Sequence, residues 1–286
     1  MYLKSIYTII KRKIFCLFNY FLKISSPTIA CQLNNFRQII MGRNIVFKYI
    51  KNEDLFEVKD GNLKMYFKDK MRGMFTYSYG PANRADSLAK TYNLDLINFL
   101  ENDTIVDCGA NFGDIYTWFK TKKLKIKYIS FEPSLDEFKC IQLNCRDQTN
   151  NQIALSNKIG QFDFYCKSDS GDSSLLEPAN GFTKIIKIKT TTLDEYVERN
   201  KLEKIKLFKV EAEGYEPEIL EGAINTLPKI EFIAVDGSPE RGLNADTTIE
   251  EVKNFLIKNN FKLVSINTDG KWIKGLFKNL LFDATI

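Results

Sequence analysis

The feature that most constrains this chain is a β-branched segment, residues 105–108, that runs into a glycine-bearing turn and then into a helical pattern. The turn reads Gly109-Ala110-Asn111-Phe112-Gly113, and residues 115–119 continue with helical spacing. Glycine lets the backbone approach a ligand closely, and the start of a helix offers free N–H groups. The stretch therefore predicts a strand–glycine loop–helix unit. For the loop alone, a plain turn inside an α/β core stays open as the alternative.

A second segment, residues 128–131, reads as a strand and ends in Glu132. In nucleotide-binding α/β units, an acid about 20 residues after the glycine loop accepts hydrogen bonds from ribose hydroxyls. This loop has the form Gly-x-x-x-Gly and lacks the central glycine that lets the backbone approach a pyrophosphate. S-adenosylmethionine has a ribose and no phosphate. The pattern therefore favours S-adenosylmethionine over a dinucleotide.

Histidine is absent from the 286 residues, which excludes a His-based triad, a His general base and His metal ligands. Acid–base chemistry must come from Asp, Glu, Lys, Tyr or Cys. The formal net charge of +5 is a mild excess and does not argue for a nucleic-acid partner. The six cysteines include no Cys-x-x-Cys and are expected to be reduced, so no metal ligand is assigned.

After Glu132 the chain alternates helical and strand patterns to its end, which predicts an α/β fold with a mostly parallel sheet flanked by helices. Two strand patterns, 160–165 and 185–189, flank a polar loop at 168–174 and predict a β-hairpin insertion. That loop is either a flexible tip or a lid over substrate, with the tip as the default. A helix is expected over 248–259, followed by strands over 261–266 and near 280–282.

Residues 1–24 are set apart by basic and aromatic residues around a short apolar run, too short to span a bilayer. They predict a helix that lies in a membrane interface or packs on protein, and a signal peptide fits poorly. We expect three parts: a basic amphipathic arm over 1–45, a small β segment over 46–82 with a hairpin turn at Asp60-Gly61-Asn62, and the main domain over 83–286.

A charged segment ends another expected strand: Lys209-Val210-Glu211-Ala212-Glu213-Gly214-Tyr215-Glu216. Strand alternation puts Lys209 and Glu211 on one side. Opposite charges in a buried strand are costly unless they are paired or useful. They lie at the carboxyl end of the strand, the edge where open α/β sheets bind ligands. Helix capping with one ion pair is the structural alternative.

Six short motifs occur here in the order and spacing of the FkbM-type methyltransferases, and the chain resembles that family over about residues 100–237. They are Val106 to Gly113, Phe131-Glu132-Pro133, Gln142-Leu143-Asn144, Ala154-Leu155-Ser156, Thr192-Leu193-Asp194 and Lys209 to Glu216. The family usually has Asp where Glu211 stands, and often Glu where Asp236 stands. These departures predict a different substrate pocket. They also leave a catalytically degenerate site open as an alternative.

The resemblance implies a class I, Rossmann-like S-adenosylmethionine-dependent methyltransferase that acts on a hydroxyl of a carbohydrate, glycolipid or related metabolite. We expect Asp107 to hold the methionine ammonium, Glu132 to bind the ribose and Ile153 and Ala154 to flank the adenine. Backbone of Gly109, Ala110, Asn111 and Gly113 would line the cofactor. The base would be Glu211, Glu213 or Asp236, with Lys209 orienting the acceptor or tuning the acid. An acid cluster that holds a divalent cation is the second choice.

Two other functions stay open from sequence. One is a catalytically degenerate, membrane-associated binding or scaffold protein of the same fold. The other is a nicotinamide-dependent sugar oxidoreductase, which would need the pyrophosphate loop that this sequence lacks. We expect a cytoplasmic protein, with residues 1–24 contacting the inner membrane face, no nucleic-acid partner and a small-molecule or glycan acceptor. The oligomeric state is not readable from the sequence.

Overall fold

The computed structural model describes residues 16–167 and 171–282 of the chain. The chain forms two compact units, Met1–Asn83 and Arg84–Ile286, and each is described here by itself. Most of the predicted basic arm, residues 1–15, lies outside the described residues. Within the described ranges, no helix combines the length and apolar character needed to cross a membrane.

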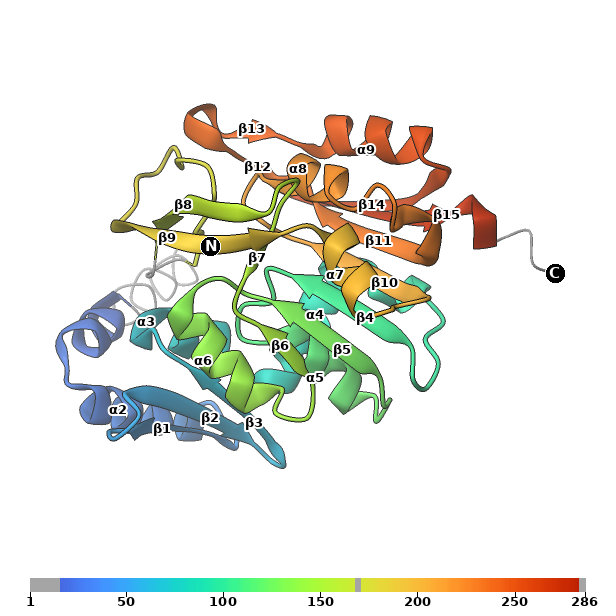
Figure 1. The fold of residues 1–286 in the computed structure, drawn as a ribbon. Coiled ribbons are helices and arrows are strands. Elements are labelled where there is room, and N and C mark those ends of the chain that lie inside the picture. The colour runs from blue at the N-terminus through green and yellow to red at the C-terminus, as the bar shows by residue number, and fades with distance from the viewer. Residues whose placement is uncertain (1–15, 168–170, 283–286) are drawn as a thin grey trace, which may run out of the picture. The chain divides into compact units, whose positions relative to one another are not determined.

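The first unit holds a three-stranded antiparallel sheet and two further helices (Figure 1). The hairpin predicted at Asp60-Gly61 is confirmed, with Gly61 in the left-handed region. A helix that sequence reasoning missed begins at Pro27, where proline is favoured because the first helical N–H has no partner. Residues 16–24 are also helical. The elements are α2 (Pro27–Ile40), β1 (Ile45–Ile50), β2 (Leu55–Asp60), β3 (Leu63–Phe67) and α3 (Lys70–Thr76).

The second unit is built on a seven-stranded sheet with the strand order β14-β15-β11-β10-β4-β5-β6. Neighbouring strands from β11 to β6 are parallel, and β15 runs antiparallel to both of its neighbours. The predicted α/β fold with a mostly parallel sheet is confirmed. The strands are β4 (Thr104–Cys108), β5 (Lys127–Phe131), β6 (Thr149–Asn151), β10 (Ile205–Val210), β11 (Ile230–Asp236), β14 (Phe261–Asp269) and β15 (Trp272–Asn279).

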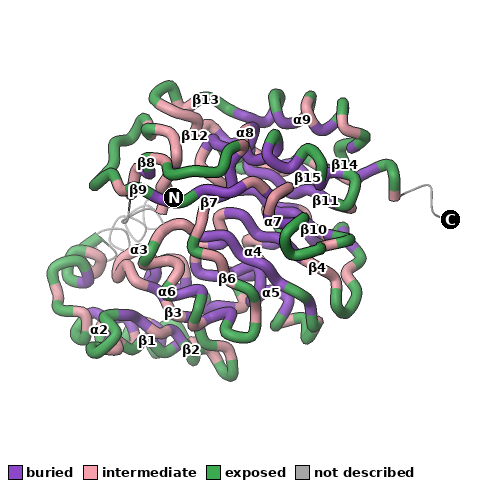
Figure 2. The backbone as a smooth tube through the Cα atoms, viewed as in Figure 1, coloured by how far each residue is buried: buried purple, intermediate pink, exposed green. Residues whose placement is uncertain are grey.

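Successive strand residues point to opposite sides of this sheet. Both faces therefore carry apolar side chains, and helices cover both. Ile105 and Leu207 pack into one apolar cluster with α4, α5 and α6, whereas Val106 and Phe208 pack into another with α7, α8 and α9. Figure 2 shows the central strands as buried. The helices are α4 (Pro81–Thr91), α5 (Asp114–Thr121), α6 (Leu135–Asn144), α7 (Leu193–Arg199), α8 (Glu216–Glu221) and α9 (Ile249–Lys258).

Two small sheets sit outside the main one. The predicted hairpin insertion is confirmed as an antiparallel pair, β8 (Gly160–Cys166) and β9 (Lys184–Thr191), and β7 (Ala154–Leu155) pairs with β9. A second pair is β12 (Pro239–Arg241) with β13 (Asp246–Thr247). Short 3₁₀ turns complete the fold: Leu94–Leu96, Leu227–Lys229, Gly242–Asn244 and Leu280–Phe282.

The prediction of a last strand near 280–282 is wrong, because those residues form a 3₁₀ turn. The last strand is β15, which pairs with β14 through a turn at Asp269-Gly270. Gly270 has a positive φ of 61°, as a tight hairpin turn requires. The Asp-Gly signal that located the hairpin at residue 60 was therefore present here too.

The order of strands reverses at β4. From β4 the chain moves outward through β5 and β6, then returns to place β10 and β11 on the other side of β4. In open α/β sheets the crevice at such a reversal, outside the carboxyl ends of the strands, is where ligands bind. The residues that follow β4 and β10 therefore lie beside the predicted ligand crevice.

Candidate active site

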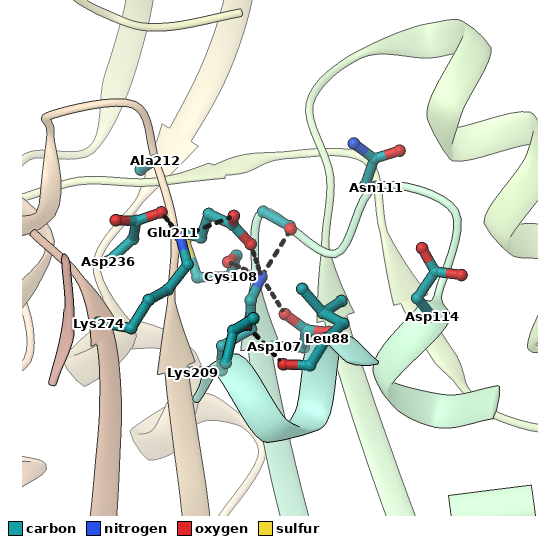
Figure 3. A network of polar contacts seen from close by, with 12 residues as sticks. Leu88, Asp107, Cys108, Asn111, Asp114, Lys209, Glu211, Ala212, Asp236 and Lys274 are labelled. Carbon is teal, nitrogen blue, oxygen red and sulfur yellow. Dashed lines mark hydrogen bonds and ion pairs between the residues drawn. The ribbon is translucent and has the colours of Figure 1, made fainter. Parts of the chain in front are cut away.

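Four charged side chains lie along one edge of the sheet, at the carboxyl ends of three parallel strands and near the start of the antiparallel β15 (Figure 3). Asp107 of β4 is the register partner of Lys209 of β10, and Asp236 of β11 is the register partner of Lys274 of β15. Acidic and basic side chains thus alternate along the sheet edge, on the face that α4 covers. Because opposite charges neighbour each other, each carboxylate has a cation within contact distance.

Lys209 is the centre of this row and is 1% exposed. Its Nζ lies 3.0 Å from Asp107 Oδ1 and 2.9 Å from Glu211 Oε2, and it donates to the carbonyl of Gly109 at 2.9 Å. Burial alone would lower the pKa of Lys209, but these two carboxylates raise it above its ordinary value. Lys209 is therefore a fixed cation that joins the glycine loop to the end of β10.

Asp107 is fully buried between two partners. Tyr128 donates its hydroxyl to Asp107 Oδ2 at 2.5 Å, and Asp107 Oδ1 has the ion pair with Lys209 but no hydrogen bond. An unfilled acceptor position on a buried carboxylate can take one more donor. The expected role of Asp107 as partner of an ammonium stays a prediction that this geometry permits.

Glu211 is held in its ionised form. Burial would raise its pKa, but Lys209 and Lys274 outweigh burial and lower the pKa to about 2. The Lys274 Nζ lies 3.8 Å from Glu211 Oε1 and also contacts Asp236, whose other oxygen accepts from Ser238. A carboxylate with so low a pKa is a weak proton acceptor near neutral pH. The arrangement favours Glu211 and Asp236 as fixed charges rather than as the base.

The glycine loop is shaped by the chain itself. A Cβ on Gly109 would lie 1.9 Å from the Glu211 carbonyl oxygen, and a Cβ on Gly113 would lie 2.5 Å from Cys145 Sγ. Both glycines have positive φ, as does Asn111 between them. The loop is tied to β5 through Gly109 N–H, which donates to the Phe131 carbonyl at 3.0 Å. Glycine is thus needed at 109 and 113 for close approach to protein atoms.

Glu132 ends β5 beside this loop and is 6% exposed. Its carboxylate accepts from the N–H of Asn111 at 2.8 Å and from the N–H of Ser134 at 2.9 Å. Burial raises the pKa of Glu132 to about 7, and these two hydrogen bonds limit the shift. A carboxylate has about four acceptor positions, so Glu132 can still accept ribose hydroxyls.

The neighbourhood of Glu132 fits a bound nucleoside. Asn111 Oδ1 is buried and finds no hydrogen-bond partner among the residues that the structure describes, which leaves a polar atom for a ligand donor. The Asn151 carbonyl accepts from the Glu132 N–H at 3.0 Å, so the chain that leads to Ile153 and Ala154 leaves from beside Glu132. The roles expected for Glu132 and Asn111 in binding S-adenosylmethionine stay predictions that these contacts permit. The individual assignments of Ile153, Ala154, Ala110 and Gly113 remain predictions.

A pocket of about 260 Å³ opens on the other side of Glu211. Its walls include three of the four predicted catalytic residues, Glu211, Glu213 and Asp236, whereas Lys209, Asn111 and Glu132 do not line it. The site thus has two sides that meet at Glu211. The remaining lining residues are Arg84, Leu88, Thr91, Asp172, Glu240, Asn267, Asp269, Trp272 and Lys274.

Glu213 and Glu240 form a pair of carboxyl groups in this pocket. Burial raises the pKa of Glu213 well above its ordinary value, and Glu240 raises it further. Burial raises the pKa of Glu240 to about 8, with further contributions from Glu211 and Glu216. Groups whose pKa lies near the working pH are the best general bases. The pair is therefore better suited to accept a proton than Glu211 is.

Two contacts bring Glu240 to this place. A Cβ on Gly214 would lie 2.4 Å from Arg241 Cα, so only glycine lets β12 approach the loop after β10. Arg241 then donates to the Gly214 carbonyl at 2.6 Å and makes a two-pronged ion pair with Glu218 of α8. Bidentate pairs of this kind fix geometry as well as charge. They position Glu240, its neighbour in sequence, beside Glu213.

Several residues in the motifs that carried the resemblance have structural roles. Glu216 accepts from the N–H groups of Ala212 and Gly214 and from the Thr248 hydroxyl. Asn144 donates to the Phe112 carbonyl at 2.8 Å and so braces the glycine loop. Asp194 accepts from both the N–H and the hydroxyl of Thr226. These side chains shape the loops around the site.

Sequence reasoning did not single out Glu240, Lys274, Trp272 or Asp172. The Asp269-Gly270 turn was a usable signal for Lys274, because a hairpin there places Lys274 on a strand next to Asp236. Glu240 reaches the pocket through long-range packing that no local pattern marks, whereas Asp172 belongs to the polar loop that the sequence offered as a flexible tip or a lid over substrate. Among the described residues, no group of three or more acidic or cysteine side chains has an arrangement that could hold a metal ion. All six cysteines are free thiols.

A mostly parallel sheet with polar side chains at the strand reversal is the architecture of nucleotide-binding α/β folds. Within that class, the family described as Methyltransferase FkbM domain matches residues 107–263, more than half of the chain. The chain therefore belongs to the FkbM methyltransferase family and is a methyltransferase that uses S-adenosylmethionine.

Two curated proteins are similar to this chain. Hexuronic acid methyltransferase AglP of Haloferax volcanii is 29% identical over 190 residues, which cover 63% of this chain and 72% of that protein. The 2-O-methyltransferase NoeI of Sinorhizobium fredii is 24% identical over 169 residues, 51% of this chain and 68% of that protein.

Solved structures with a related fold share less sequence identity with this chain than these two proteins do. The fibrillarin pre-rRNA processing protein of Methanococcus jannaschii covers 82% of this chain and 98% of its own, with 12% identity and a TM-score of 0.44. TrmK of M. capricolum covers 68% and 67%, with 11% identity and a TM-score of 0.41. The assignment to the family rests on the sequence match and not on these overlaps.

Proposed function

We propose that this protein transfers the methyl group of S-adenosylmethionine to a hydroxyl of a carbohydrate, glycolipid or related metabolite. The support is threefold. The two curated relatives are named for methyl transfer to a hexuronic acid and to a 2-O position. The pocket beside Glu211 is lined by hydrogen-bonding side chains. One wall carries Trp272, whose side chain is 42% exposed and offers an apolar face on which a sugar ring can pack.

On the cofactor side, S-adenosylmethionine supplies an electrophilic methyl group and leaves as S-adenosylhomocysteine. Glu132 would accept the ribose hydroxyls, and Asn111 Oδ1 would accept one further donor. Asp107 would face the methionine ammonium with the acceptor position that Lys209 and Tyr128 leave open. The glycine loop would present backbone to the cofactor. These groups bind and orient, which is the main task in a displacement reaction.

On the acceptor side, the chain must remove the hydroxyl proton as the oxygen attacks. The Glu213–Glu240 pair would receive that proton, because its pKa values lie higher than that of Glu211. Lys209, Glu211, Asp236 and Lys274 would hold the edge of the site rigid through their mutual ion pairs. The single observation that supports this division is that Glu211 lines the acidic pocket, whereas Glu132 and Asn111 do not.

The test is calorimetric titration of the full chain with S-adenosylhomocysteine, with NADH as control, followed by an assay of S-adenosylhomocysteine release with methyl glycosides. We expect micromolar binding of S-adenosylhomocysteine, no binding of NADH and release that depends on a glycoside. Binding of NADH alone would contradict the proposal. Cofactor binding without release in the presence of any hydroxyl acceptor would point to the degenerate binding protein.

We further propose that the protein is cytoplasmic and that its N-terminal arm touches the inner membrane face. Support comes from the helix over residues 16–24, where Leu17, Tyr20 and Ile24 are each more than half exposed. An exposed apolar and aromatic surface on a basic segment suits a lipid interface. Co-sedimentation with anionic vesicles should fall when residues 1–24 are deleted, and equal partitioning would contradict this location.

A further inference from the structure

The acceptor pocket is lined by more acidic than basic side chains. Six of its twelve lining residues are acidic and two are basic, Arg84 and Lys274. Both cations already have carboxylate partners. Lys274 contacts Asp236 and Glu211, and Arg84 Nε lies 3.3 Å from Asp114 Oδ2. Neither cation is therefore left over to balance the rest of the pocket.

Four acids remain in the pocket wall: Asp172, Glu213, Glu240 and Asp269. Within residues 16–167 and 171–282, no ion pair reaches any of these four carboxyl groups. In addition, Glu240 Oε2 is buried and has no hydrogen-bond partner. A buried acceptor atom without a donor is costly and indicates that a ligand supplies one.

These acids come from separate parts of the fold that the structure holds together. Asp172 follows β8, Glu213 follows β10, Glu240 lies on β12 and Asp269 ends β14. Ser174 donates to the Glu213 carbonyl at 3.1 Å and so ties the segment of Asp172 to the loop of Glu213. The Arg241–Glu218 pair fixes β12. These acidic side chains are thus held together in the walls of one cavity.

We propose that this pocket selects its acceptor by charge and takes a sugar that carries a protonated amino group, in preference to a neutral sugar and against a uronic acid. The inference rests on the proposed function and names its substrate class. An ammonium group would donate up to three hydrogen bonds to the unpaired carboxyls. A uronate would add a like charge to a site of reduced dielectric, where repulsion is strong.

The positive charge would also assist the reaction. A cation beside Glu213 and Glu240 favours their ionised forms, which are the forms able to accept the hydroxyl proton. A uronate at the same place would keep them protonated. The same contacts therefore select the acceptor by its charge and favour the ionised form of the base.

The experiment compares three methyl glycosides of matched size: a 2-amino-2-deoxyhexose, the parent hexose and the hexuronate. Their binding to the full chain is measured by calorimetry with S-adenosylhomocysteine present, at neutral pH and physiological salt. We expect the amino glycoside to bind about tenfold more tightly than the hexose, or about 1.4 kcal/mol, and the hexuronate to bind weakest. Equal affinity of hexose and amino glycoside, tighter binding of the hexuronate, or no binding of the amino glycoside would overturn the proposal.

A variant tests whether the pocket acids cause the preference. Asp172→Asn with Asp269→Asn removes two rim charges that are not assigned as the base, and it should reduce the preference for the amino glycoside several-fold. Glu250→Gln removes an exposed acid of α9, outside the pocket wall, and should leave the preference intact. An unchanged preference in the double variant would overturn the role of these acids.

Failure of this inference is distinguishable from failure of the proposed function. If S-adenosylhomocysteine binds and S-adenosylmethionine is turned over with a neutral or acidic glycoside, only the charge selection is wrong. If S-adenosylhomocysteine does not bind, the proposed function itself fails. Retained S-adenosylhomocysteine affinity in the double variant shows that it is folded.

Discussion

The two sides of the site differ in how they are built. On the cofactor side, the glycine loop follows β4 and Glu132 follows the next strand, β5. These residues therefore lie close in sequence. On the acceptor side, Asp172, Glu213, Glu240 and Lys274 come from four segments that only the folded sheet brings together. Glu132 on the first side accepts hydrogen bonds from backbone N–H groups, whereas the second side holds a group of four carboxyls that no ion pair reaches within the described residues. A local sequence pattern can therefore predict a cofactor site without predicting the substrate pocket.

The charge row between the two sides connects them. Lys209 contacts both the glycine loop and Glu211, so it links backbone that would face the cofactor to a wall of the pocket. The predictions below perturb one side at a time, or this link, and they run from the largest expected effect to the smallest.

The largest effect is expected from removing both candidate bases. Glu213→Gln with Glu240→Gln should lower turnover by about 10²–10⁴-fold, the usual contribution of a general base, and leave S-adenosylhomocysteine affinity unchanged. Steady-state release of S-adenosylhomocysteine measures the turnover. Near-normal turnover in the double variant would transfer the base role to Glu211 or Asp236.

The link between the two sides is tested by Lys209→Met. The substitution leaves Asp107 and Glu211 without their buried cation, and loss of one partner of a buried pair costs about 3–5 kcal/mol of unfolding free energy. Urea unfolding measures this change. Lys253→Met, which breaks an exposed pair on α9, should cost less than about 1 kcal/mol. Equal costs for the two variants would contradict the structural role of Lys209.

The shape of the glycine loop is tested by Gly109→Ala. Its Cβ would meet the Glu211 carbonyl, and its φ is positive, so we expect a loss of about 2–3 kcal/mol together with weaker S-adenosylhomocysteine binding. The matched control is Gly242→Ala, which has a similar φ but no atom within 4 Å of the new Cβ. Thermal unfolding and calorimetry compare the two. Indistinguishable variants would mean that the close approach at Gly109 is unimportant.

The smallest effect is a pH dependence on the cofactor side. The pKa of Glu132 is raised to about 7, and ribose hydroxyls bind the ionised form. Deprotonation therefore accompanies binding, and affinity for S-adenosylhomocysteine should strengthen as pH rises through 7. We expect it to fall by up to about tenfold for each pH unit below the pKa. Glu132→Gln should bind weakly with a flat profile, and a flat profile in the wild type would contradict the assignment.

The sequence predicted the fold well because its signals are local. The strand, the glycine loop and Glu132 follow one another along the chain, and alternation in β10 correctly placed Lys209 and Glu211 on one side. The arm expected over residues 1–45 was not resolved into its elements, so the separate helix that begins at Pro27 was missed. The strand near residue 280 was misplaced, because the Asp269-Gly270 turn was overlooked.

The acceptor site was predicted only in part, for a physical reason. Glu240 reaches Glu213 because Gly214 permits β12 to approach closely and Arg241 forms an ion pair with Glu218 of α8. Both contacts depend on the three-dimensional packing. The pKa of Glu211 is lowered by Lys209, two residues away, and by the distant Lys274, whereas burial and distant acids raise the pKa of Glu213 and of Glu240. Residue type alone could not rank these three acids as proton acceptors.

The central claim, that the site divides at Glu211 into a cofactor edge and an acceptor pocket, is tested most directly by one calorimetric comparison. S-adenosylhomocysteine is titrated into the wild type, Glu132→Ala and Glu240→Gln. The division predicts micromolar binding by the wild type, a large loss in Glu132→Ala and unchanged affinity in Glu240→Gln. Equal affinity of the wild type and Glu132→Ala, or a comparable loss in Glu240→Gln, would contradict it.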